Sequence, residues 1–129
     1  PITGKEGIAD VLKNVIDARP DAVMFPSDSF VKANADQIIS ALNRHRIPSI
    51  VVIPEMVKEN GALLSLGPDY RTLGRLAAEN ALQVLQGQAP ANLPVRTVPH
   101  LSLLIHLATA DRLGINIPLQ LLSVATVVR

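Results

Sequence analysis

The 129-residue sequence contains no cysteine and no tryptophan. The absence of cysteine excludes disulfide bonds, thiol nucleophiles and Cys-ligated metal ions. Aromatic residues make up only 2% of the chain, as Phe25, Phe30 and Tyr70, so few rings are present to build a sugar- or aromatic-binding site. The first residue is Pro1, with no Met and no signal sequence, which predicts a processed product or a piece of a longer protein.

Several functional classes also lack their signatures. The net charge is +1 and no basic block is present, so we predict no nucleic-acid binding. No apolar run approaches the ~18 residues of a membrane span. His45, His100 and His106 do not have metal-ligand spacing, and we expect no metal and no cofactor. GxSxG, Walker and GxGxxG motifs are missing, and nothing activates Asp28 and Glu55 as an acid/base pair, so an enzyme is the least favoured class.

Apolar residues are plentiful, at 48% of the chain, and 129 residues fit one domain that buries roughly two-thirds of the surface that its unfolded chain exposes.

The first amphipathic pattern has helical spacing and predicts a helix through Ile8, Val11, Leu12, Val15 and Ile16. It is followed by a predicted strand, a helix and a second strand, at Ala22–Phe25, Val31–Leu42 and Ile50–Ile53. The two apolar runs end alike, at Pro26 and Pro54, which is typical of repeated strand-helix units.

The second half of the chain continues this alternation. We predict strands at Ala62–Leu66 and Leu101–Leu107, a long helix at Tyr70–Gln86, a connecting stretch at Gln88–Pro99, and a short helix that Gly114 ends. A last helical turn leads into a final apolar run at Ala125–Val128. Because parallel strands need crossover helices, the pattern predicts an α/β fold, a three-layer Rossmann-like lobe with a mainly parallel sheet and helices on both faces.

Polar residues follow the predicted strands. They are Ser27, Asp28 and Ser29 after the first strand, Glu55 after the second, and Asp69 and Tyr70 after the third. Ligands of open parallel sheets bind beyond the carboxyl ends of the strands, so these six residues are the candidate ligand-binding residues. Asp28 and Asp69 also stand where an N-cap is expected, and the sequence leaves capping and ligand contact open as alternatives.

A longer pattern carries a resemblance to a known family. The chain reads DAVMFPSDS, HRIPSIVVIPE, GALLSLGPDYRTLGRLAAENALQVLQGQAPANLPV and LSLLIHLATADRLGINIP in succession. This succession resembles the C-terminal part of ABC-transporter substrate-binding proteins of the type I periplasmic-binding architecture. The resemblance spans nearly the whole chain, although each of its motifs alone is weak.

The resemblance implies a two-lobed protein that closes on a small polar solute such as an amino acid, without catalysis. This chain is then one lobe, with ligand contacts from Ser27 to Ser29 and from Glu55, while Asp69 and Tyr70 lie near the hinge crossover. Its expected partners are the solute and an ABC permease, and its expected location is periplasmic or otherwise extracytoplasmic. The alternative is a ligand-sensing input domain of a regulatory protein, which the genes on either side would distinguish.

One further prediction concerns assembly. The helix at 69–87 is apolar around most of its circumference, which requires cover from more than one neighbour. In the two-lobed architecture that the resemblance implies, the chain crosses the hinge near Gly67 and Pro68. This helix then belongs to the other lobe. Where that lobe is missing, the helix either folds back on its own sheet or packs against a second copy, with domain swapping about Gly67 and Pro68 as one form of this, and we predict a homodimer built largely on it.

Overall fold

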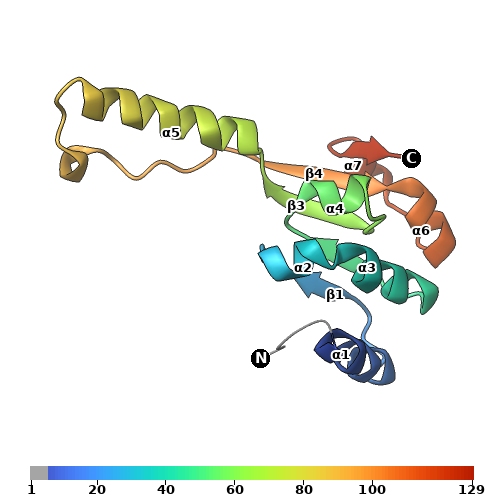
Figure 1. The fold of residues 1–129 in the computed structure, drawn as a ribbon. Helices are drawn as coiled ribbons and strands as arrows, with labels where there is room; N and C mark the ends of the chain where they lie inside the picture. Colours follow the sequence, from blue (N-terminus) through green and yellow to red (C-terminus); the bar gives the residue numbers. More distant parts are fainter. Residues whose placement is uncertain (1–5) are drawn as a thin grey trace. The chain divides into compact units, whose positions relative to one another are not determined.

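The computed structural model describes residues 6–129 and contains a five-stranded sheet with the strand order β1-β2-β3-β4-β5 (Figure 1). The strands are β1 (Val23–Phe25), β2 (Ser49–Val51), β3 (Leu64–Pro68), β4 (Leu101–His106) and β5 (Thr126–Val128). Residues of β1 pair in parallel with β2, those of β2 with β3, and those of β4 with β5. The mainly parallel α/β sheet predicted from the sequence is therefore confirmed.

The direction of the chain reverses between β3 and β4. The backbone N–H of His106, at the end of β4, donates to the carbonyl of Leu63, which directly precedes β3, at 2.9 Å. The end of one strand thus lies beside the beginning of the other, and the arrows of Figure 1 point in opposite directions. The carboxyl end of β4 consequently lies at the sheet edge where β1, β2 and β3 begin.

The helices follow the predicted periodicity closely, with two differences: a break within one predicted helix, and a short helix at Pro54–Lys58, which the sequence did not predict. The helices are α1 (Glu6–Asp17), α2 (Ser29–Ala33), α3 (Ala35–Arg44), α4 (Pro54–Lys58), α5 (Tyr70–Leu85), α6 (Leu107–Leu113) and α7 (Leu119–Leu122), with a 3-10 turn at Pro90–Asn92. The prediction of one helix at Val31–Leu42 is wrong, because the chain is broken between α2 and α3 at Asn34. Asn34 leaves the helical conformation, with φ −115° and ψ 18°, and its side-chain amide shares the Phe30 carbonyl with its own backbone N–H.

The chain separates into two compact units. The first unit comprises the residues up to Gly67 together with Leu103–Arg129, and it contains nearly all of the sheet. The second unit comprises Pro68–Ser102, that is, α5 and the segment that follows it. The sequence showed no linker that would separate two such units.

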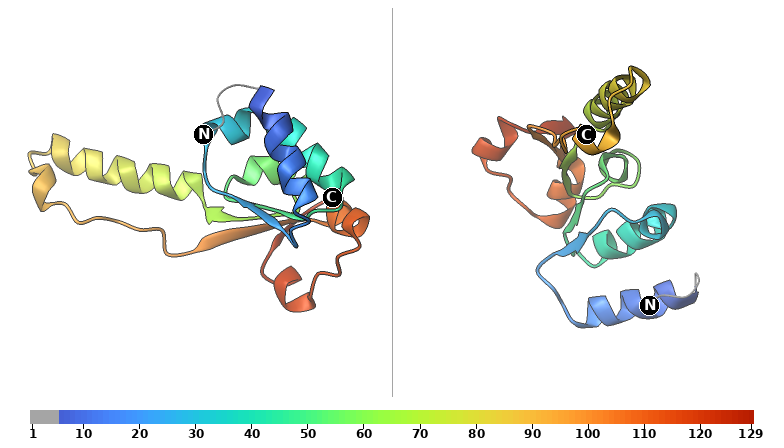
Figure 2. Two further views of the ribbon diagram at one scale, coloured as in Figure 1. Left: turned by 90° about the horizontal axis from the view of Figure 1, so that it is seen from below. Right: turned by 90° about the vertical axis from the view of Figure 1, so that its left-hand side faces the viewer.

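The core of the first unit lies between the sheet and helices α1, α3 and α4. Its fully buried members include Ile39, Leu42, Val51 and Val57. Leu104 of β4 joins this core, so the next residue, Ile105, points to the opposite face, where it is equally buried. Helices α6 and α7 lie on that opposite face, whereas α1 to α4 lie on the first (Figure 2), which confirms the predicted three layers.

Candidate functional site

The carboxyl ends of β1 and β2 carry four of the six predicted ligand-binding residues. Phe25 of β1 is the register partner of Val51 of β2, and the strands run in parallel, so both open toward the same edge. Ser27, Asp28 and Ser29 follow β1, and Glu55 follows β2. The fold of the first unit therefore brings the two predicted loops to neighbouring positions.

Asp28 caps the helix that follows β1. It has an extended backbone, with φ −140° and ψ 132°, and its Oδ1 accepts a hydrogen bond from the backbone N–H of Val31 at 2.8 Å. Capping, one of the two roles considered for Asp28, is thus confirmed. Among residues 6–129 no hydrogen bond engages its Oδ2, and the side chain is exposed, so the carboxylate retains capacity for a second partner.

Glu55 lies in the first turn of α4, which the sequence prediction missed. Pro54 occupies the first helical position, where its missing N–H has no consequence, and Glu55 follows it. The side chain is half-buried, in contrast to the exposed Ser27, Asp28 and Ser29. An acidic residue in the first turn also favours the helix, so Glu55 has a structural role beside any ligand contact.

Asp69 and Tyr70 belong to the second unit. Asp69 caps α5 with both carboxylate oxygens: Oδ1 accepts from the N–H of Arg71 at 3.2 Å, and Oδ2 accepts from the N–H of Thr72 at 3.1 Å and from its hydroxyl at 2.7 Å. The Thr72 hydroxyl is the main reason that the pKa of Asp69 lies below its ordinary value. Capping is therefore confirmed for Asp69 too, and its carboxylate is more fully engaged than that of Asp28.

A polar network that the sequence did not predict joins α3 to α6. The carbonyl of Gly61 accepts hydrogen bonds from Asn43 Nδ2 and from the Thr109 hydroxyl, both at 3.0 Å. Arg112 Nη2 donates in turn to the Thr109 oxygen at 3.0 Å. Since Thr109 is fully buried and Gly61 adopts φ +73°, this network is a structural device that fixes α6 against the turn before β3.

His106 is the N-cap of α6, and its Nδ1 accepts a hydrogen bond from the N–H of Thr109 at 3.3 Å. Burial is the main reason that the pKa of His106 lies below its ordinary value, and the positive charge of Arg112 adds to the effect. Both effects favour the neutral imidazole that can accept this hydrogen bond. This role was hard to predict from the sequence, because histidine is not a preferred capping residue.

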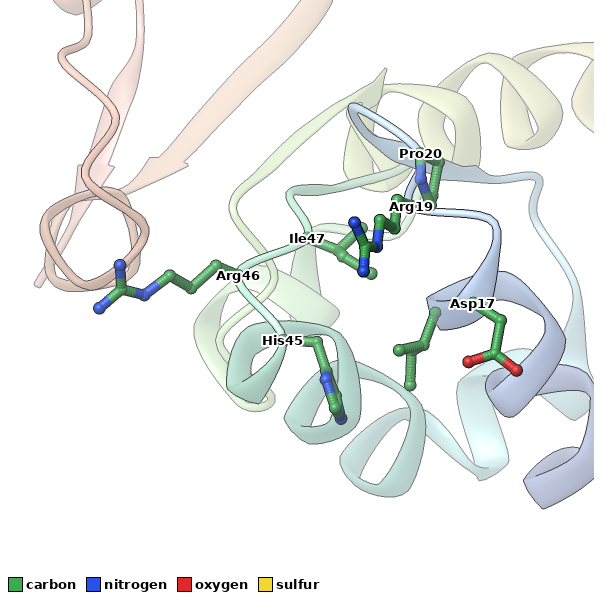
Figure 3. Close-up of a pocket in the computed structure, with 7 residues that line it drawn as sticks. Asp17, Arg19, Pro20, His45, Arg46 and Ile47 are labelled. Atoms are coloured by element: carbon green, nitrogen blue, oxygen red, sulfur yellow. The ribbon is translucent and has the colours of Figure 1, made fainter.

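An open cavity of about 520 Å³ lies at the other edge of the sheet, where β1 and β2 begin (Figure 3). It is lined by Ile16, Asp17, Arg19, Pro20, His45, Arg46 and Ile47. These residues come from the turns that end α1 and α3, and Arg46 points away from the cavity. Cations at helix C-termini are favoured by the helix dipole, which accounts for this cluster without a ligand.

The described residues hold neither a metal-binding cluster nor a membrane-spanning helix. Within residues 6–129 no three His, Asp or Glu side chains gather closely enough to hold a metal ion. No helix in that range is long and apolar enough to cross a membrane. The fold and the residues at its strand ends thus define an α/β lobe with polar groups suited to binding a ligand.

Comparison with known proteins assigns the family. The family of ABC transporter substrate binding proteins matches residues 6–129, and this chain belongs to that family. The resemblance inferred from the sequence is therefore confirmed. The proteins to which the chain is similar are substrate-binding proteins, so its family role is binding rather than catalysis.

Three relatives illustrate the similarity. A tyrosine-binding protein of Clostridioides difficile is 30% identical over 96 residues, which are 74% of this chain and 28% of that protein. The ABC domain from Streptococcus pneumonia solved in complex with L-Trp is 27% identical with a TM-score of 0.82, covering 96% of this chain and 42% of that one. A conserved domain protein from Vibrio cholerae is 31% identical with a TM-score of 0.80, covering 94% and 41%. The chain thus spans less than half the length of these relatives.

Proposed function

We propose that this chain is one lobe of the solute receptor of an ABC import system, and that its solute is an amino acid. Family membership supports the receptor role. Two relatives support the solute class, since one is described as a tyrosine-binding protein and another was solved in complex with L-Trp. The expected partner is an ABC permease, and the expected location is extracytoplasmic, as is typical of the family.

The observation that carries the proposal is the carboxylate of Asp28, which follows β1. Its Oδ2 accepts no hydrogen bond from residues 6–129. The four residues at this edge of the first unit provide two carboxylates and two hydroxyls, with no lysine or arginine among them. Such a set is suited to a ligand group that is positively charged and donates hydrogen bonds, such as the α-ammonium of an amino acid. Asp28 meets this group through Oδ2 while Oδ1 continues to cap α2.

The remainder of the site is expected from a second lobe. The longer relatives have room for one, since this chain spans 41% and 42% of the two solved chains. Closure of two lobes on the solute would then present the closed form to the permease. In this arrangement Asp69 and Tyr70 lie near the crossover between lobes, and their contribution is secondary to that of Asp28.

Calorimetry against amino acids and sugars tests the proposal, carried out on a longer family protein that contains this lobe. We expect heat from amino acids, with tyrosine and tryptophan tried first, and none from sugars. If no amino acid binds while a sugar does, the solute class is wrong. If nothing binds and a hydrolase activity is measured instead, the receptor role itself is wrong.

Substitutions at Asp28 test the site within the same protein. Asp28→Ala should weaken binding by about 1.5 to 3 kcal/mol, because a charge-assisted hydrogen bond is lost. Asp28→Asn separates the two roles, since asparagine caps a helix as well as aspartate does but lacks the charge. We expect Asp28→Asn to keep the melting temperature and lose affinity. Asp111→Asn, which removes an exposed carboxylate from α6, is the control and should change neither. Unchanged affinity in Asp28→Asn would limit Asp28 to capping.

A further inference from the structure

Gly67 of β3 lies against the connection that leads from β2 to α4, and both segments belong to the first unit. An added Cβ at Gly67 would lie 2.3 Å from the carbonyl oxygen of Val52 and 3.3 Å from its carbonyl carbon. A Cβ essentially never approaches another atom within 3.0 Å, and the neighbour here is backbone rather than the end of a flexible side chain. Only glycine therefore fits at this position while Val52 keeps its place.

The geometry of the sheet explains why the two segments meet. Val51, the last residue of β2, is the register partner of Ser65, so their side chains point to the same face of the sheet. Val51 belongs to the core on that face, and Ser65 is also fully buried. Gly67 lies two residues beyond Ser65 and faces the same way. The chain that leaves β2 turns onto this face to form α4, and its backbone passes Gly67 on the way.

A side chain at Gly67 would displace Val52 rather than β3. The sheet order places β3 between β2 and β4, so it is held on both sides. Val52 lies beyond Val51, where the pairing of β2 with β3 ends, and it is only half-buried. The Val52 carbonyl would therefore make most of the movement that lengthens the contact from 2.3 Å to above 3.0 Å.

The movement of Val52 would reach Glu55, because the residues between them have little freedom. Ile53 is the N-cap of α4 and is buried, and Pro54 occupies the first helical position, where its ring fixes φ. The N–H of Met56 donates to the Ile53 carbonyl at 3.1 Å, which closes the turn that contains Glu55. Glu55 consequently takes its position at the sheet edge from Val52.

We propose that Gly67 is a positioning residue of the ligand-binding edge, which fixes the place of Glu55 through the carbonyl of Val52. The inference rests on the proposed function, since it requires that Glu55 contacts the solute. A binding site must hold its groups within about 0.5 Å of their productive positions, and the movement that a Cβ at Gly67 forces is larger than this. Asp28 does not depend on Gly67, because it follows β1 and caps α2.

Amide resonances of this chain test the geometry without any solute. Gly67→Ala should shift the amides of Ile53 and Glu55 and leave that of Asp28 in place. Gly114→Ala is the matched control, because Gly114 adopts φ +72° at the end of α6 and an added Cβ there costs stability without a nearby atom to displace. It should shift neither Ile53 nor Glu55. Unchanged amides of Ile53 and Glu55 in Gly67→Ala overturn the proposal, whatever the solute is.

Calorimetry with an amino acid, on the longer family protein, tests the consequence for binding. Gly67→Ala should weaken binding about tenfold, and Glu55→Gln at least as much, because a charge-assisted hydrogen bond is loosened in one variant and lost in the other. The double variant should bind no more weakly than Glu55→Gln alone, since Gly67 acts through Glu55. Gly114→Ala should lower the melting temperature and keep the affinity. Equal losses of affinity in Gly67→Ala and Gly114→Ala would assign both to lost stability and overturn the positioning role.

The outcomes distinguish this proposal from the proposed function. If the unmodified protein binds no amino acid, the proposed function is wrong, and the amide resonances still decide whether Gly67 positions Glu55. If it binds one and Gly67→Ala binds as tightly, or if the effects of Gly67→Ala and Glu55→Gln multiply, the positioning role is wrong.

A second variant applies if Gly67→Ala does not fold. Val52→Gly gives the backbone between β2 and α4 more freedom without adding an atom, and Val52 is not fully buried, so this variant should fold. It should weaken amino acid binding and add nothing to the effect of Glu55→Gln. Unchanged affinity in Val52→Gly overturns the proposal.

Discussion

The two units of this chain differ in how they use apolar residues. In the first unit, Ile39, Leu42 and Val57 are completely buried in the core between the sheet and helices α1, α3 and α4. In the second unit, the apolar residues of α5 are spread around more of the helix, Leu73 and Leu76 are half-buried, and no residue is fully buried. Apolar residues at helical spacing thus form a packed layer in one place and a more exposed helix in the other. The difference shows that periodicity determines which face of a helix is apolar, while the neighbours determine whether that face is covered.

Truncation of one apolar side chain in each unit should give the largest contrast. Ile39→Ala removes buried methyl groups from the core and should cost about 3 kcal/mol of unfolding free energy. Leu82→Ala removes a side chain of α5 that is 55% exposed and should cost less than about 0.5 kcal/mol. Urea unfolding followed by circular dichroism measures both. Similar losses in the two variants would contradict the contrast between the units.

Glycine-to-alanine substitutions should have opposite effects on stability in the two units. A Cβ at Gly67 of β3 would lie 2.3 Å from the Val52 carbonyl oxygen, so Gly67→Ala must displace backbone and should cost about 2 kcal/mol. Gly74 has open space around it and lies inside a helix, so Gly74→Ala should stabilise α5 by up to about 1 kcal/mol. Thermal unfolding reports the first effect, and helix content in dilute solution reports the second. If Gly67→Ala stabilised the protein, the Val52 carbonyl oxygen would have to lie farther from Gly67 than this 2.3 Å contact implies.

Loss of a helix cap should affect the second unit locally. Asp69→Ala removes three hydrogen bonds at the start of α5, and no buried side chain of that helix compensates for them. We expect faster amide exchange in the first turn of α5 and little change in melting temperature, because the core of the first unit is untouched. Hydrogen exchange read by NMR measures this. A global loss of stability would mean that α5 unfolds together with the sheet.

The smallest expected effect is a dependence on pH in the first unit. The pKa of His106 is lowered in the folded protein, so the unfolded chain takes up a proton first as the pH falls. Stability from this group is therefore full above the ordinary histidine pKa of about 6.5 and declines as the pH falls below it. His106→Asn keeps a capping side chain but does not titrate, and should flatten that decline. An unchanged pH profile would assign the decline to other groups.

Much of the fold was predictable because its signals are local. The helix at Tyr70–Gln86 and the caps at Asp28 and Asp69 depend on residues within one or two turns, and each was found where it was expected. Strand ends at Pro26 and Pro54 likewise indicated the edge where the candidate site lies. The break at Asn34 was missed because it is a change of backbone conformation at a single residue, which does not interrupt the apolar period. The helix α4 was missed because five residues are too few to show a period.

The sequence by itself determined the kinds of element, the apolar face of each long helix and the polar residues that follow the strands. The tertiary structure decided what depends on distant residues: the reversal at β4, the meeting of Asn43 and Thr109 on the Gly61 carbonyl, and the exposure of α5. The physical reason is that hydrogen bonds and side-chain spacing within one element act over a few residues. Burial and strand direction instead depend on contacts between segments tens of residues apart, which no local pattern encodes.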